Sequence, residues 1–152
     1  MESESNQDLS TEQIIQSTSH LDVIETVISS LQEDQSAMVS RSEEGTTLWK
    51  FKYGSVEVFV QLTGETDDDL LAVWSPVLDL PAKNESVLLR KLLELNWTST
   101  FESHFAVMDD KVVVAAQRTV AELSPGEVSR NITMVASVAD SYDEILQAEF
   151  GA

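Results

Sequence analysis

Three consecutive aspartates are the group in this sequence whose chemistry comes nearest to metal binding. Asp67, Asp68 and Asp69 offer carboxylate oxygens, which are the ligands that Ca²⁺ and Mg²⁺ prefer. Consecutive side chains of an extended segment point in alternating directions, however, and the D-x-[DN]-x-[DN]-G spacing of a calcium loop is missing. We therefore interpret the run as a solvated turn and predict no metal site, with a cation site here as the alternative.

Side chains that commonly carry out acid–base or nucleophilic catalysis are scarce. The chain has two histidines, His20 and His104, and no cysteine. Disulfides, thiolate catalysis and cysteine-based metal centres are thereby excluded. None of the five glycines lies in a dinucleotide-binding or Walker-type spacing. Because 27 acidic residues produce close carboxylate pairs by chance, such pairs do not indicate a hydrolase. We predict no catalytic residue and no cofactor, and a protein that is not an enzyme.

Aromatic residues could form a ligand platform on one strand face. Trp49, Phe51 and Tyr53 alternate along the chain, so they share a face if the segment is a β-strand. Such a face is more often the core beneath a helix, and we expect that arrangement here. We expect Trp74 and Trp97 to be packing residues as well. A small ligand-binding protein centred on the aromatic face remains an alternative.

The charge excludes two classes of partner. The chain has 152 residues, a net charge of −18 and 42% hydrophobic residues, which indicates one folded acidic domain rather than an acidic tail. Binding to nucleic acid or to an anionic membrane needs clustered Lys and Arg, and no such cluster is present. Residues 1–9 are polar and acidic, without the features of a secretion signal. We expect them to be disordered, with a single domain over 10–152 in a cytoplasmic protein.

The elements that would position these residues can be predicted from periodicity. Ser10 and Gln13 form a capping-box signal for a helix over 11–32, although the Ser17-Thr18-Ser19 run allows a start near His20. Residues 33–46 are polar and predict a connection. A hairpin is expected over 47–62 around Gly54-Ser55, in which Lys52 faces Glu57 as an ion pair.

The remainder of the chain predicts two helices and three strands. A strand over 70–79 contains Pro76, which suggests a bulge or a sheet edge. A helix over 84–95 is apolar on a broad face, so we expect it to be largely buried, with Asn96 at its end. A second hairpin joins 102–108 to 111–119 around Asp109-Asp110. Ser124-Pro125-Gly126-Glu127 then begins a helix that ends at Gly151. The order α-β-β-β-α-β-β-α predicts an α+β fold, an antiparallel sheet with packed helices.

Several of these segments resemble the YbjN family, whose fold is like that of type III secretion chaperones. The resemblance lies in the LLRKLLELNW segment (88–97), the FAVMDD hairpin (105–110) and the ADSYDEIL segment (139–146). One departure is Asp109-Asp110, where the family usually has glycine. The resemblance implies a non-enzymatic domain that forms a homodimer and binds another polypeptide. A regulatory module for a signalling or transcription protein is the alternative. The nearly neutral stretch 84–121, with a net charge of −1, is the expected dimer surface.

Overall fold

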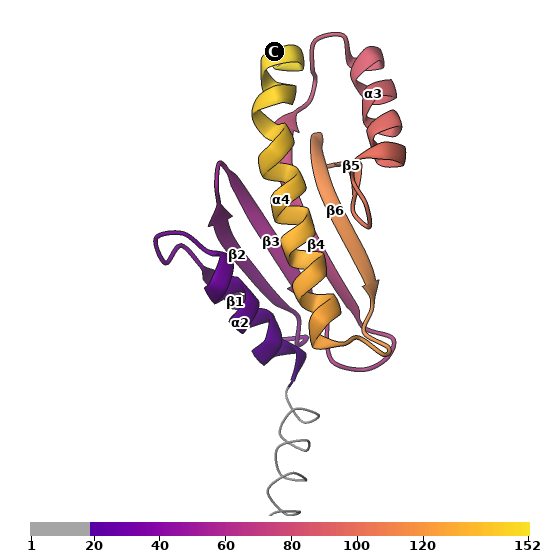
Figure 1. Cartoon of the computed structure of the whole chain (residues 1–152). Helices are drawn as coiled ribbons and strands as arrows, with labels where there is room; N and C mark the ends of the chain where they lie inside the picture. The colour runs from indigo at the N-terminus through magenta and orange to yellow at the C-terminus, as the bar shows by residue number, and fades with distance from the viewer. Residues whose placement is uncertain (1–18) are drawn as a thin grey trace, which may run out of the picture.

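The computed structural model describes residues 19–152, which form a six-stranded antiparallel sheet and three helices (Figure 1). The strand order in the sheet is β1-β2-β3-β4-β6-β5. In chain order the elements are α2 (His20–Leu31), β1 (Met38–Arg41), β2 (Thr47–Tyr53), β3 (Val56–Leu62), β4 (Leu70–Asp79), α3 (Glu85–Thr98), β5 (His104–Met108), β6 (Lys111–Thr119) and α4 (Pro125–Phe150). The α+β class and the predicted order are confirmed, with β1 as one additional strand.

The structure describes only part of the segment predicted as the first helix. The Ser10–Gln13 capping signal lies outside the described residues. Within them α2 begins at His20, as the alternative prediction had it, and the Ser19 side chain accepts a hydrogen bond from the backbone N–H of Asp22.

The hairpin of β2 and β3 has the predicted register. Trp49 lies opposite Val60 and Phe51 opposite Val58, with all four side chains buried on one face. Lys52 lies opposite Glu57 as expected. The predicted ion pair between them is wrong, because the Glu57 carboxylate instead lies 3.4 Å from the ammonium of Lys50, two residues back along β2. Diagonal neighbours in a sheet are within reach of a long lysine side chain.

The remaining strands were predicted with nearly their observed bounds. β4 lies between β3 and β6, so Pro76 marks a bulge and not a sheet edge, and the register shifts between Pro76 and Leu78. In the second hairpin Phe105 lies opposite Val114, which is the register that the predicted turn at Asp109-Asp110 implies, although β5 begins at His104 and not at residue 102. Asp109 and Asp110 both have positive φ, the conformation that a two-residue hairpin turn demands.

The strand β1 is a correction to the predicted polar connection over 33–46. It pairs with β2, with Val39 opposite Trp49, but its four side chains are all exposed. Because neither face of β1 is buried, its sequence has no apolar alternation that would mark it as a strand.

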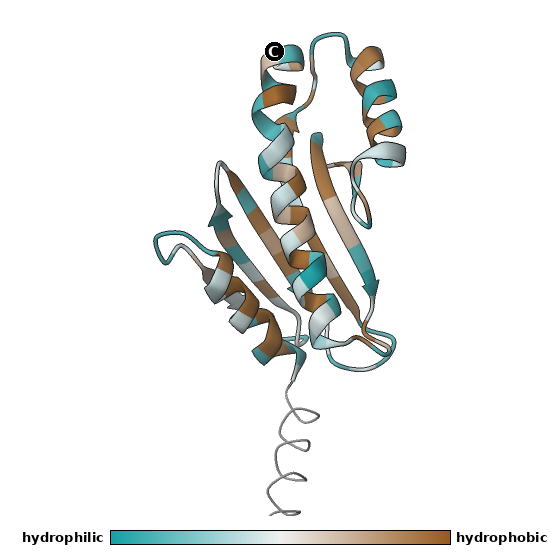
Figure 2. Ribbon diagram, viewed as in Figure 1, coloured by the Kyte–Doolittle hydropathy of each residue, from teal (hydrophilic) through white to brown (hydrophobic). Residues whose placement is uncertain are grey.

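Helices α4 and α2 cover one face of the sheet, and the core lies between them and the strands (Figures 1 and 2). The predicted start of α4 is confirmed: the Ser124 hydroxyl accepts from the backbone N–H of Glu127, and Pro125 occupies the first turn. The helix ends at Phe150, before Gly151, as expected. Among residues 19–152, none of the helices combines the length and the apolar content that crossing a membrane requires.

Candidate functional site

The aspartate run forms a hydrogen-bonded turn. The carboxylate of Asp69 accepts from the hydroxyls of Thr63 (2.9 Å) and Thr66 (2.7 Å) and from the backbone N–H of Thr66 (3.0 Å). The bonds from Thr66, followed by the bond from Thr63, hold the pKa of Asp69 below its usual range. Asp67 and Asp68 are exposed. Both oxygens of Asp69 are therefore engaged within the turn.

The two histidines lie on separate elements, His20 at the start of α2 and His104 at the start of β5. Across residues 19–152, no three His, Cys, Asp or Glu side chains come together in a way that could hold a metal ion.

The aromatic residues divide between core and surface. Trp49 and Phe51 are core residues, as expected, and Tyr53 packs against that core. Trp74 also packs, since it stacks on Phe59 with ring centroids 5.5 Å apart. The prediction for Trp97 is wrong: its side chain is 89% exposed at the end of α3.

The exposure of Trp97 belongs to a larger correction, because α3 is not largely buried. Only Leu88 and Leu92 are fully buried in this helix. Helices α4 and α2 cover the face of the sheet that forms the core. Helix α3 instead packs beside β5, at the edge of the sheet (Figure 1). A helix that packs through one narrow stripe leaves its other apolar residues in solvent. We call the exposed apolar residues Val87, Leu93 and Trp97 the α3 face.

Asn96 explains why α3 does not end where the sequence suggested. The helix continues to Thr98, and the amide of Asn96 lies beside β5. Its Oδ1 accepts from the backbone N–H of Phe105 (2.7 Å), and its Nδ2 donates to the carbonyl of the same residue (3.3 Å). Asn96 thus satisfies the outward-facing backbone groups of β5 at this point, as a neighbouring strand would.

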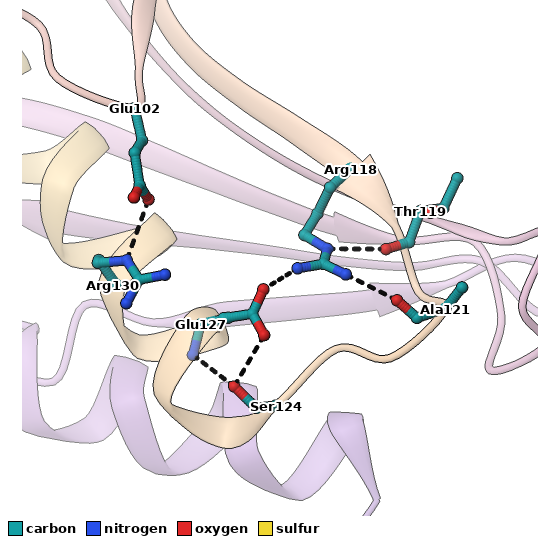
Figure 3. Close-up of polar contacts among 7 residues, drawn as sticks. All are labelled: Glu102, Arg118, Thr119, Ala121, Ser124, Glu127 and Arg130. Atoms are coloured by element: carbon teal, nitrogen blue, oxygen red, sulfur yellow. Dashed lines mark hydrogen bonds and ion pairs between the residues drawn. The ribbon is translucent and has the colours of Figure 1, made fainter.

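The loop after α3 displays a second exposed aromatic residue. Phe101 is 80% exposed and has a φ of +57°, which is unusual for a bulky residue. Its neighbours are anchored: Thr100 is buried, and the carboxylate of Glu102 pairs with Arg130 of α4 at 3.0 Å (Figure 3). Phe101 lines two adjoining hollows along α4, of about 490 and 410 Å³.

The N-terminal end of α4, beside this loop, is fixed to the sheet by Arg118. Its guanidinium pairs with Glu127 and donates to the carbonyls of Thr119 and Ala121 (Figure 3). Glu127 also accepts from the Ser124 hydroxyl. The surface that carries Phe101 is therefore built on a firmly held helix end.

A second candidate surface lies at the opposite edge of the sheet, between α2 and β1. A hollow of about 200 Å³ is lined there by residues of both elements and by Trp49. The indole N–H of Trp49 is buried and has no hydrogen-bond partner in the described part of the chain. Leaving a buried donor unsatisfied costs about 1–3 kcal/mol, so such a group calls for an explanation. The sequence offered no signal for this surface, because exposed strand residues show no apolar periodicity.

Comparisons with known proteins agree with this architecture. One solved structure, titled "Crystal Structure of the ExsC-ExsE Complex", contains a chain that is 24% identical, with a TM-score of 0.53. The match covers 70% of this chain and 80% of that one, and it confirms the expected fold of the type III secretion chaperone kind. The search of curated proteins found no significant match.

The family comparison covers most of the described residues. Residues 20–148 match YbjN, whose description reads "Putative bacterial sensory transduction regulator". This range includes every strand and all but the last residues of α4. The chain therefore belongs to the YbjN family.

Proposed function

We propose that the chain is a homodimeric, non-catalytic protein-interaction domain that binds another polypeptide in the cytoplasm. The observation that carries the homodimer is the α3 face, where Val87 is 59%, Leu93 71% and Trp97 89% exposed. Large apolar side chains gathered on one helix indicate an interaction surface. The family description and the fold shared with a chain solved in a complex support a protein-binding role.

Charge favours a second copy of the chain as the occupant of the α3 face. Two chains of net charge −18 repel each other, so self-association is least unfavourable where charge is lowest. The stretch 84–121, which includes α3, sums to −1. The charges within the face are Arg90 and Glu94, which already pair at 3.0 Å. One cation beside one anion is self-complementary across a two-fold axis.

Sedimentation equilibrium of the full chain tests the homodimer. We expect a dimer for the natural sequence and a monomer for Trp97→Glu, because a carboxylate in an apolar interface carries a large desolvation cost. Val39→Glu is the matched control, since it adds the same charge to an exposed apolar residue on β1. A natural chain that is monomeric at micromolar concentration contradicts the homodimer.

The proposed binding of a polypeptide could serve two roles. In the first, chaperone-like role the partner is an extended segment, and in the second, regulatory role the partner is a folded protein. The family description favours the regulatory version. Limited proteolysis of a co-purified partner distinguishes them, because a folded partner resists cleavage whereas an extended segment does not. Affinity capture from the native lysate that enriches no polypeptide contradicts both versions.

A further inference from the structure

The sheet face opposite α4 and α2 carries a row of side chains that crosses all six strands. The direct cross-strand partners that form this row, in the order of the strands in the sheet, are Met38, Lys50, Phe59, Trp74, Ala115 and His104. The alternate residues of the same strands form the core beneath α4 and α2. The row therefore lies on the side of the sheet that these two helices leave open.

Three members of the row are already stacked on one another. The rings of Phe59 and Trp74 have centroids 5.5 Å apart and planes 7° from parallel, and the Lys50 ammonium lies 5.9 Å from the Phe59 ring centroid. Neighbouring strands are about 4.8 Å apart, so side chains that face each other across them lie at a stacking distance. The next position in the row is Ala115, whose methyl group is too small to continue the stack.

A hollow of about 380 Å³ lies where the stack is interrupted. Trp74, Ala115 and His104 all line it, and we call it the Ala115 hollow. Trp74 and His104 are two strand spacings apart, which is about 10 Å, so a ring placed over Ala115 would lie about 5 Å from each. Aromatic rings attract each other at centroid distances of about 4.5–7 Å. The hollow therefore fits one flat ring that continues the stack from Trp74 to His104.

The two sides of this position, along the strands, differ in polarity. Gln61 and Gln117 flank Ala72 in the neighbouring row, and both line the hollow. Their amides can each donate and accept hydrogen bonds. On the other side, Val113 lies opposite Ala106, and both side chains are apolar. A ring with polar atoms along one edge, as in a heteroaromatic molecule, matches this arrangement.

The charge of the lining indicates the charge of the ligand. None of the twelve residues that line the hollow is Asp, Glu, Lys or Arg. The chain as a whole carries a net charge of −18, which repels anions, and the hollow holds no cation that would retain one. It also holds no carboxylate that would pair with a cationic ligand. An uncharged ligand is therefore favoured.

We infer that the Ala115 hollow binds an uncharged, planar heteroaromatic molecule whose ring lies between the Trp74 indole and the His104 imidazole. The polar edge of the ring forms hydrogen bonds with the amides of Gln61 and Gln117. The site shares no residue with the α3 face. The inference therefore goes beyond the proposed binding of a polypeptide and does not depend on it.

The test is a titration of the full chain, labelled with ¹⁵N and followed by NMR. The probes are adenosine and caffeine, two uncharged heteroaromatic molecules, with ribose as the comparison that lacks a flat ring. We expect at least one probe to shift the Trp74 indole N–H signal and the backbone amide signals of Ala115 and Gln117 until the site is saturated. The indole signal is identified by its loss in Trp74→Phe. Ribose should shift none of these signals.

Two alanines provide matched variants of the chain. Ala115 lies in the hollow, whereas Ala148 is exposed on α4. Ala115→Leu should fill the space for the ring and weaken binding of the probe at least about tenfold, whereas Ala148→Leu should not change it. Two tryptophans provide a second pair. Trp74→Leu removes one wall of the site and should weaken binding, whereas Trp97→Leu removes an exposed indole from α3 and should not.

Several results would overturn the inference. They are the absence of a saturable shift with either probe, equal binding by Ala115→Leu and Ala148→Leu, and tighter binding of adenosine 5′-monophosphate than of adenosine. Shifts of the same signals with protein concentration alone would assign this face to a second copy of the chain and would also overturn it. Sedimentation of the same samples reports the homodimer separately, so a monomeric chain that binds a probe contradicts the homodimer and not the Ala115 hollow.

Discussion

At the scale of single residues, the ADSYDEIL segment (139–146), which contributed to the resemblance to the YbjN family, has a structural role. Asp140 of α4 accepts hydrogen bonds from the backbone N–H and the hydroxyl of Ser55, both at 3.0 Å. The hydroxyl also lies 2.9 Å from the carboxylate of the buried Asp143. Gly54 has positive φ, and a Cβ there would collide with the Asp140 carboxylate. The last helix is thus joined to the turn of the first hairpin.

Removal of the Asp140 carboxylate should therefore loosen this turn. We expect Asp140→Ala to lower the free energy of unfolding by about 1–2 kcal/mol, since it removes charge-assisted hydrogen bonds at a partly exposed site. Chemical denaturation provides the measurement. Ser141→Ala is the control, because the Ser141 hydroxyl bonds only within its own helix, and its effect should stay within about 0.5 kcal/mol. Equal effects of the two variants would contradict the role given to Asp140.

Asp69 should make stability depend on acidic pH. Its pKa is lowered in the folded chain, chiefly by Thr66, so its ionised form stabilises the fold. This contribution is fully present above the unfolded pKa, near 3.8, and disappears as the pH falls through the lower folded value. The difference in unfolding free energy between the natural chain and Asp69→Asn should be constant near neutrality and shrink below about pH 4.

Two comparisons bear on this result for Asp69. Asp68→Asn is the control for the loss of one negative charge, because Asp68 is exposed and accepts no hydrogen bond among the described residues. Calcium or magnesium that raised the thermal unfolding temperature would restore the alternative of a metal site, since a ligand selective for the folded state must stabilise it. We expect no rise.

At the scale of elements, α3 offers adjacent leucines with opposite roles. Leu92 is 5% exposed and Leu93 is 71% exposed. Leu92→Ala should cost about 2–5 kcal/mol of folding stability, because it leaves a cavity. Leu93→Ala should change the stability of the protomer by less than about 0.5 kcal/mol but weaken the dimer. Denaturation at low protein concentration and sedimentation at high concentration separate the two effects. A monomer destabilised equally by both changes would contradict the α3 face.

The elements also show how far sequence reasoning reaches. Alternation in β2, β3 and β6 and the Ser-Pro-Gly-Glu start of α4 predicted their bounds closely, because those patterns arise from burial on one side. β1 escaped prediction because its four residues are all exposed. The burial of α3 was overestimated because periodicity shows which residues are apolar but not whether another element covers them. The hollow between α2 and β1 depends on the three-dimensional positions of both elements, and no local sequence pattern indicates those positions.

At the scale of the whole molecule, the charge of −18 is unevenly distributed along the chain. The stretch 84–121, which contains the α3 face, sums to −1. The stretch 19–46, which contains α2 and β1, carries six carboxylates and one arginine. Self-association at the α3 face must therefore overcome repulsion between the remaining, more acidic parts of two chains.

Salt should consequently strengthen the proposed homodimer or leave it unchanged. Raising the ionic strength from about 0.01 M to 0.1 M shortens the screening length from about 30 to 10 Å, which weakens the repulsion between two acidic protomers. We expect the dimer dissociation constant, measured by sedimentation equilibrium at both ionic strengths, to fall or stay constant. A dimer that salt weakened would contradict this account, because charge pairs rather than apolar contacts would then dominate the α3 face.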